Sequence, residues 1–452
     1  MSYADSFQDS AADLLPLAQA AARKSDWGRT CHYLYRVQQQ ATPLTSPAAF
    51  QWRDLALRTL QMGDFNVRWD VAKLMAQQSS ELIQLEDIVA VLADATEEDW
   101  SLAWFLVRLL AEFRCAESVS ALVALLQRSP SEDVVAAIIT ALSQIGEPAI
   151  EPVSRLLEEP HARPVAVQIL ARIRHPAAAA AVVVTVNDAD PAVRALAIPT
   201  LADLSYPQAK PILIADLIDV AAGVRRAAVI GLGAQRDTLS ATAIGKMGAL
   251  LWDINLSVRR AAISAMGRLR RNQAADILYE ALQSNSTPPA LRAELIRAIA
   301  LTETAVGLSH LNAYACARQA SGDPSRTWIG DIASSLGRIE TPDLAPAAVS
   351  LLTLLLAWTQ PSNSIARQTI ATSLGRLGQI NSADTLISML DTADAGVRLH
   401  VTAALRKLAP VEAHRRLMAI ASSPQTEPNL RQNVTLALRD WNQSATSANH
   451  SH

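Results

Sequence analysis

Two tryptophans and two cations are the residues of this chain whose types and spacing best suit ligand binding. Trp69 and Trp104 are each followed four residues later by a cation, Lys73 and Arg108 respectively. In a helix, residues four apart lie on the same face. An indole ring beside an ammonium or guanidinium group offers an apolar surface with a basic edge. We therefore predict that these four residues bind a partner.

The tryptophans also suit a second interpretation, in which they fill the N-terminal end of a hydrophobic core. Five of the nine tryptophans lie between residues 27 and 104, where large side chains replace small ones. Indole rings bury a large apolar area when they pack inside a protein. Both interpretations stay open at this stage.

A second candidate site is a group of arginines in the middle of the chain. Arg225 and Arg226 are followed 34 residues later by Arg259 and Arg260. Guanidinium groups bind carboxylates and phosphates in a planar, bidentate geometry. We predict that Arg226 and Arg260 contact an anionic part of the same partner.

The sequence offers little for catalysis or metal binding. Cys31, Cys115 and Cys316 are far apart and form no C-x-x-C pair, so neither a disulfide framework nor a thiolate zinc site is expected. No phosphate-binding glycine loop, nucleophile elbow or H-E-x-x-H motif is present. Cys31 and His32 are adjacent, but neighbouring side chains in a helix point apart. We expect no catalytic residues and no metal.

The positions of the candidate residues follow a repeated pattern. The pattern Val-Arg-x-x-Ala-x-x-x-Leu begins at Val193, and close copies begin at Val224, Val258 and Val397. Nine of the twelve copies hold Arg in the second position, so the repetition is not accidental. The intervals between copies run from 28 to 38 residues. The arginine position falls at residues 68, 103, 135, 163, 194, 225, 259, 292, 329, 367, 398 and 431.

Each repeat reads as two helices. A leucine-rich stretch precedes a turn, and the Val-Arg stretch follows with its apolar positions at i, i+4 and i+8, which is one face of a helix. No single helix pair can bury such a face, so consecutive pairs must stack into one continuous core. The residue after each arginine, where Trp69, Trp104, Arg226 and Arg260 lie, is expected on the concave side of the stack.

The Val-Arg helix, followed by glycine and a leucine-rich helix, resembles the HEAT repeat. The short period is most similar to the HEAT-like repeats of the phycobilisome (bilin) lyase family, and the resemblance covers roughly residues 52–441. It implies an all-α fold, an α-solenoid of about twelve helix pairs. We expect an N-terminal helical cap at residues 1–50, the solenoid at 51–441 and a disordered tail at 442–452.

The resemblance also implies a structural role for the arginine ladder, the set of arginines at the repeated position. In HEAT repeats, an acidic residue four positions before the arginine and the arginine itself are expected to bridge neighbouring repeats. Acidic or amide residues at that position are Asp64, Asp190, Asn255, Asn363 and Asp394.

Composition and charge limit the classes of protein to which this chain could belong. The chain has 452 residues, of which 50% are hydrophobic, so general disorder is not expected. The net charge is −3, but residues 1–160 carry −10 and the remainder +7. This distribution disfavours nucleic acid and suits a docking protein with complementary surfaces. No apolar stretch reaches the length of a membrane span, and the first ten residues lack a signal-peptide core, so a cytoplasmic location is expected.

These observations favour a non-catalytic scaffold or assembly factor that holds a protein partner in a concave groove and needs no cofactor. The resemblance adds an alternative, a bilin lyase or lyase-like chaperone that delivers an open-chain tetrapyrrole (a bilin) to a phycobiliprotein cysteine. It also leaves open an accessory role in iron–sulfur assembly. The scarcity of aromatic residues beyond residue 104 counts against the lyase.

Overall fold

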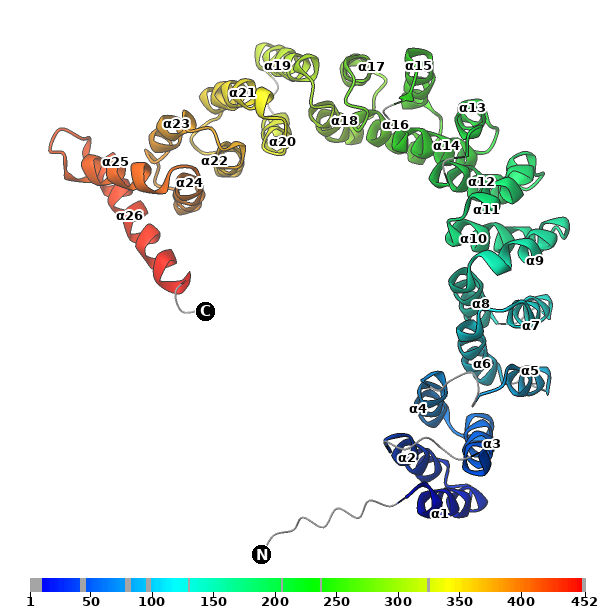
Figure 1. Cartoon of the computed structure of the whole chain (residues 1–452). Coiled ribbons are helices and arrows are strands. Elements are labelled where there is room, and N and C mark those ends of the chain that lie inside the picture. The colour runs from blue at the N-terminus through cyan, green and yellow to red at the C-terminus, as the bar shows by residue number, and fades with distance from the viewer. Residues whose placement is uncertain are drawn as a thin grey trace, which may run out of the picture. The chain divides into compact units, whose positions relative to one another are not determined.

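A computed structural model describes most of the chain, and every regular element within the described part is a helix (Figure 1). This confirms the all-α solenoid that the repeats predict. The chain divides into two compact units, Met1–Ala209 (unit 1) and Lys210–His452 (unit 2). The described residues are 10–40, 46–77, 83–94, 99–128, 131–204, 206–235, 238–322 and 326–448.

Unit 1 is a succession of helix pairs joined by short turns. Several helices continue for a few residues as a 3₁₀ turn, for example at Leu156–Glu158 and Val183–Asn187. Its helices are α1 (Ala11–Arg23), α2 (Trp27–Gln38), α3 (Ser46–Met62), α4 (Phe65–Ala76), α5 (Leu85–Asp94), α6 (Trp100–Phe113), α7 (Ala116–Gln127), α8 (Glu132–Ile145), α9 (Ile150–Arg155), α10 (Arg163–Ile173), α11 (Pro176–Val182) and α12 (Pro191–Asp203).

Unit 2 continues the same pattern from the boundary residue Ala209. Its helices are α13 (Ala209–Ala215), α14 (Ala222–Ala234), α15 (Ala241–Ala249), α16 (Leu256–Gly267), α17 (Asn272–Gln283), α18 (Pro289–Leu301), α19 (Ala305–Ala320), α20 (Thr327–Leu336), α21 (Ala345–Trp358), α22 (Ser364–Leu377), α23 (Ser382–Ser388), α24 (Ala395–Leu408), α25 (Pro410–Ser422) and α26 (Pro428–Ala448).

Each unit has two layers of helices. In unit 1, α2, α4, α6, α8, α10 and α12 pack on one another in sequence, and in unit 2 the helices α14, α16, α18, α20, α22, α24 and α26 do the same. All of these even-numbered helices except α2 carry the repeated pattern, and within each unit they lie on the inner side of its curve (Figure 1). We call them the inner layer of each unit.

The buried positions of the inner layer are those that the pattern predicts. In α12, Val193, Ala197 and Leu201 are at most 1% exposed. Small residues allow close approach between neighbouring helices. A Cβ atom on Gly233 of α14 would lie 2.8 Å from the Cβ atom of Ala265 in α16, so only glycine fits there without a shift. Burial of this continuous apolar stripe holds consecutive repeats together.

The residues four positions before the arginines have a different role from the predicted bridge. The carboxylate of Asp64 accepts a hydrogen bond from the Val67 N–H (3.0 Å), which satisfies a free donor in the first turn of α4. Asp190, Asn255, Asn363 and Asp394 cap their helices in the same way. The carboxylates that meet ladder arginines are Asp188, Asp253 and Asp440, together with Asp99, which lies four residues before the repeated position 103 and both caps α6 and pairs with Arg68. The ladder does bridge neighbouring repeats, but the bridging prediction was wrong about these partners.

The two ends of the solenoid differ in how they are covered. At the N-terminus, α1 and α2 pack on α3, and α2 also packs on α4. The carboxylate of Asp26 caps α2 by accepting a hydrogen bond from the Arg29 N–H (3.1 Å). At the other end, the backbone of the predicted tail at 442–452 continues α26 as far as Ala448, and residues 449–452 lie outside the described part.

Candidate functional site

The predicted aromatic pair lies on adjacent helices of the inner layer of unit 1. Trp69 is in α4 and Trp104 in α6, each one residue after the arginine position. The two indole rings stack with their centroids 6.0 Å apart and an angle of 16° between their planes. Trp69 is 36% exposed and Trp104 is half-buried, so the pair presents part of its surface to solvent.

Both predicted cations lie beside these rings, as the i, i+4 spacing requires. The Nζ atom of Lys73 is 5.0 Å from the Trp69 ring centroid. The guanidinium carbon of Arg108 is 4.9 Å from the Trp104 centroid and 5.7 Å from the Trp69 centroid. Both side chains are exposed, and among the described residues no carboxylate forms an ion pair with either. The site therefore presents two cations whose charge is available to an anionic group.

Two phenylalanines that the sequence reasoning missed complete the aromatic cluster. Phe105 is 1% exposed and meets the Trp104 ring edge-on at 5.0 Å. Phe65, at the start of α4, lies 5.3 Å from Phe105 and 6.4 Å from Trp69. Phe105 is therefore the aromatic side chain that fills the core between α4 and α6, whereas the two indole rings lie closer to the solvent. The position of Phe65 could have been predicted from the sequence, because Phe65 precedes Trp69 by four residues and therefore lies on the same face of the helix.

The aromatic pair borders a hollow across α4, α6 and α8. Its volume is about 470 Å³, within the range of ordinary ligand pockets. Cations line it on α4 and α6, and carboxylates line it on α6 (Glu112) and α8 (Asp133). We call this hollow the tryptophan groove. Besides the aromatic residues and these charges, small and polar side chains line it: Ala72, Ala76, Ala111, Ala136, Ala137, Thr140, Ala141 and Gln144.

A second hollow of about 420 Å³ lies between α2 and α4. Tyr35 and His32 line it on α2, and Asp70 and Lys73 on α4. Lys73 thus lines both hollows, so a ligand longer than a single side chain could follow the inner layer from α2 to α8.

Cys31 lines the α2–α4 hollow but is a poor nucleophile. Its side chain is buried, and burial, together with the negative charge of Asp70, raises the pKa of the thiol to about 11. A raised pKa leaves very little thiolate at neutral pH. The adjacent His32 therefore does not make Cys31 a reactive pair.

We expect Cys31 and Cys316 to react with iodoacetamide at different rates. At pH 7.5, Cys31 should react about 100-fold more slowly than the exposed Cys316, because its pKa lies about two units above the ordinary value. Mass spectrometry of the folded protein over time measures both rates. Equal labelling of Cys31 and Cys316 would show that Cys31 is accessible and ionised. Labelling in denaturant, where the difference should vanish, is the control.

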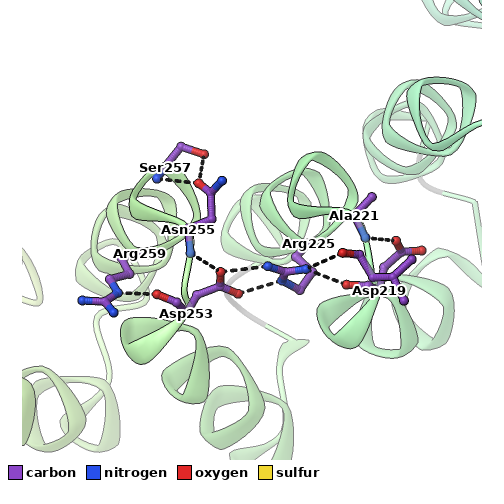
Figure 2. A network of polar contacts seen from close by, with 8 residues as sticks. Asp219, Ala221, Arg225, Asp253, Asn255, Ser257 and Arg259 are labelled. Atoms are coloured by element: carbon purple, nitrogen blue, oxygen red, sulfur yellow. Dashed lines mark hydrogen bonds and ion pairs between the residues drawn. The ribbon is translucent and has the colours of Figure 1, made fainter.

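Four arginines of the ladder, Arg68, Arg163, Arg225 and Arg398, form largely buried ion pairs with a carboxylate of the next repeat. Arg225 of α14 donates two hydrogen bonds to the carboxylate of Asp253 (2.7 and 2.8 Å), in the turn before α16 (Figure 2). It also donates to the backbone carbonyls of Asp219 (2.7 Å) and Val220 (3.1 Å) in the turn before its own helix. In the next repeat, Arg259 donates to the carbonyl of Asp253 in the same manner. One guanidinium therefore joins two successive turns.

The same arrangement occurs in unit 1 beside the tryptophan groove. Arg68 of α4 binds the carboxylate of Asp99 through two hydrogen bonds (2.7 and 2.6 Å) and the carbonyl of Gln61 (2.8 Å). The hydrogen bonds from Arg68 lower the pKa of Asp99 to about 2. Asp99 also caps α6, so this pair fixes α6 relative to α4 and thereby positions Trp104 against Trp69.

The other two predicted contact residues, Arg226 and Arg260, lie in unit 2. They are exposed on the adjacent inner-layer helices α14 and α16. Arg260 is paired with Glu294 of α18 at 3.0 Å, which sequence reasoning did not foresee. Arg226 therefore offers a more accessible charge than Arg260. The structure brings Trp69, Lys73, Trp104 and Arg108 together in unit 1, whereas these two arginines lie in the other unit.

Comparisons with known proteins agree with this fold. The family model of HEAT repeats matches residues 85–166 and 155–233, and that of the PBS lyase HEAT-like repeat matches residues 258–284. No curated protein matches the chain. No helix in the described ranges combines the length and hydropathy needed to cross a membrane.

Among solved structures, the chain is similar to the karyopherin Kap121p bound to the extreme C-terminus of the protein phosphatase Cdc14p, at 14% identity with a TM-score of 0.52. That likeness covers 96% of this chain and 58% of the karyopherin chain, so this chain spans little more than half the karyopherin's length. Kap121p bound to Nup53p is similar at 14% identity and a TM-score of 0.53, covering 96% and 57%. The complex of CpcE and CpcF of phycocyanin lyase from Nostoc sp. PCC7120 matches at 27% identity over 33% of this chain and 97% of that chain, with a TM-score of 0.28.

The fold, the repeated pattern and the family matches define this chain as a HEAT-repeat α-solenoid. Within that class, residues 258–284 match the PBS lyase HEAT-like repeat.

Proposed function

We propose that this chain is a non-catalytic scaffold or assembly factor that holds a protein partner in the tryptophan groove. The observation that carries the proposal is the stacked Trp69–Trp104 pair with Lys73 and Arg108 beside it. Aromatic and arginine side chains dominate binding energy at protein interfaces when a partner covers them. A fold that only needed stability would not require two partly exposed indoles beside two unpaired cations on one face.

The lining of the groove supports a particular kind of partner segment. An acidic side chain of the partner would pair with Lys73 or Arg108, and an adjacent apolar side chain would pack on the indoles. Glu112, one helical turn after Arg108 on α6, and Asp133 on α8 would favour a basic residue further along the segment. Solved structures of Kap121p, which has the same fold, hold protein segments such as the extreme C-terminus of Cdc14p, which supports protein as the ligand class.

Arg226 and Arg260 are part of the proposal as a second contact, for an acidic part of the same partner. Exposed arginines mainly accelerate association through long-range attraction, and salt screens that attraction. Arg226 should contribute more than Arg260, whose guanidinium is engaged by Glu294.

Charge reversal in the groove tests the proposed function. The double variant Lys73→Glu, Arg108→Glu should lose the protein that the parent captures from native lysate, because an acidic segment would then meet two carboxylates. Quantitative mass spectrometry of the captured proteins measures the loss. Arg155→Glu is the control, since Arg155 is an exposed cation of unit 1 that lies outside the groove and pairs with Glu151 of its own helix, and this variant should capture the same protein as the parent.

The same experiment separates the proposed scaffold from the alternatives. Capture of a phycobiliprotein subunit together with visible bilin absorbance would replace the scaffold by a bilin lyase or lyase-like chaperone. A co-purifying iron–sulfur assembly protein would favour the accessory role. Unchanged capture by the double variant would place the binding surface outside the tryptophan groove.

A further inference from the structure

A group of strongly exposed apolar side chains lies at two turns of unit 2, directly before α14 and α16. Val220 is 93% and Ile254 is 95% exposed, although both are β-branched residues that are usually buried. We call the group the turn ridge. It consists of Ile218 (86% exposed), Val220, Trp252 (41%), Ile254 and Leu256 (45%).

The two turns are equivalent places in consecutive repeats. Ile218 and Trp252 are 34 residues apart, as are Val220 and Ile254, and this equals the spacing of Arg225 and Arg259 in the pattern. Packed helices lie about 10 Å apart, so the turns that precede them lie side by side at the same edge of the unit. Exposed apolar side chains therefore occupy equivalent positions on two neighbouring turns.

The turns that carry the ridge are held rigidly. Arg225 binds the carbonyl of Val220 in the first turn and the carboxylate of Asp253 in the second (Figure 2). The carboxylate of Asp253 also accepts a hydrogen bond from the Asn255 N–H (2.8 Å), which fixes the backbone on either side of Ile254. Because the backbone is fixed, docking of the ridge would order few additional groups.

The region that carries the turn ridge is basic. Residues 210–271 contain ten lysines and arginines and four acidic residues. Two exposed arginines, Arg226 and Arg260, lie in the second turn of the helices that follow the ridge. Two carboxylates lie within the ridge: that of Asp253 is paired with Arg225, and that of Asp219 accepts a hydrogen bond from the Ala221 N–H (2.7 Å). The region around the ridge still has an excess of positive charge, which is complementary to an anionic surface.

We infer that the turn ridge docks onto the surface of an anionic lipid bilayer. Val220 and Ile254, more than nine-tenths exposed, project from the molecule rather than line a hollow, and projecting apolar side chains on neighbouring turns suit a flat surface. Aliphatic side chains and tryptophan beside arginine are the residues that insert into the headgroup region of a bilayer. Juxtaposed basic residues add attraction to anionic lipid. This inference does not depend on the tryptophan groove and concerns peripheral binding only.

Vesicle binding of ridge variants tests the inference. The parent protein should sediment with vesicles of phosphatidylserine and phosphatidylcholine, and less with phosphatidylcholine alone or at high salt. The double variant Val220→Asp, Ile254→Asp should bind the mixed vesicles about tenfold or more weakly, because two inserted side chains become charged. Val411→Asp is the matched control, since Val411 is 83% exposed on α25, and it should bind like the parent.

Two results would overturn the inference. One is failure of the parent to bind anionic vesicles, including the case in which the ridge proves to capture a protein instead. The other is equal vesicle binding by the parent and the double variant. Circular dichroism and thermal melting of each variant show whether it is folded, and both substitutions lie on exposed positions outside the core.

Discussion

Replacement of Trp104 by alanine is expected to weaken binding of the captured partner about tenfold or more. Trp104 stacks on Trp69 and supports Arg108, so its removal takes away one half of the aromatic surface and the group that orients a cation. Truncation of a central aromatic anchor typically costs about 2 kcal/mol or more of binding free energy. Isothermal titration of the purified partner with parent and variant measures the change.

Two further variants separate binding from folding. Trp104 packs edge-on against the buried Phe105, so Trp104→Ala should also lower the melting temperature slightly. Trp104→Phe keeps an aromatic ring there and should restore part of the affinity. Phe50→Ala removes another exposed aromatic side chain that has its own arginine, Arg53, and should leave binding unchanged. Normal binding by a folded Trp104→Ala protein would contradict the role of the groove.

The sequence predicted that Trp69, Trp104, Lys73 and Arg108 lie together, because helical periodicity relates the spacing of residues to the face of the helix on which they lie. Once Arg68 and the residue at position 103 are aligned as equivalent, Trp69 and Trp104 must occupy the same face of adjacent helices. The i, i+4 rule then places Lys73 and Arg108 beside the rings. No knowledge of turns or of distant contacts is needed for this step, because a stacked solenoid brings each repeat against the next.

The features that the sequence did not predict depend on contacts between repeats or on turn conformation. The pairing of Arg260 with Glu294 joins two repeats, and a period that varies from repeat to repeat does not fix which acid reaches which cation. Arg225 pairs with Asp253 rather than with a capping residue. The conformation of the turn before α16 determines which side chain of that turn is directed toward Arg225. The exposure of Ile254 depends on the same turn, whose sequence has no helical period to indicate a face.

Replacement of Arg225 by alanine is expected to lower the free energy of unfolding of unit 2 by about 2–4 kcal/mol, since breaking a buried ion pair leaves a charge without a partner. The side chains of Arg225 and Asp253 are only 11% and 6% exposed. The variant also leaves two backbone carbonyls without their donor. Denaturant unfolding, with hydrogen exchange of the α14 and α16 amides, measures the loss. Arg155→Ala, which removes an exposed pair within one helix, should cost about 0.5 kcal/mol or less.

The pH dependence of stability identifies the ion pair as the cause of that loss. Hydrogen bonds from Arg225 lower the pKa of Asp253 in the folded protein, below its ordinary value near 3.8. A carboxyl group with a lowered folded pKa stabilises the fold fully above its unfolded pKa, and the contribution disappears as the pH falls through the folded pKa. The parent should therefore lose this contribution below about pH 4, where the unfolded carboxyl group begins to take up a proton.

In the Arg225→Ala variant, the two hydrogen bonds from Arg225 to Asp253 are absent at every pH, and only that from the Asn255 N–H remains. The difference in unfolding free energy between parent and variant should thus be largest near neutral pH and shrink as the solution is acidified below about pH 4. Unfolding curves at several pH values between neutral and acid measure this convergence. A difference that stayed constant down to the acid limit would mean that Arg225 acts through packing of its alkyl chain and its bonds to the carbonyls of Asp219 and Val220, rather than through the charge of Asp253.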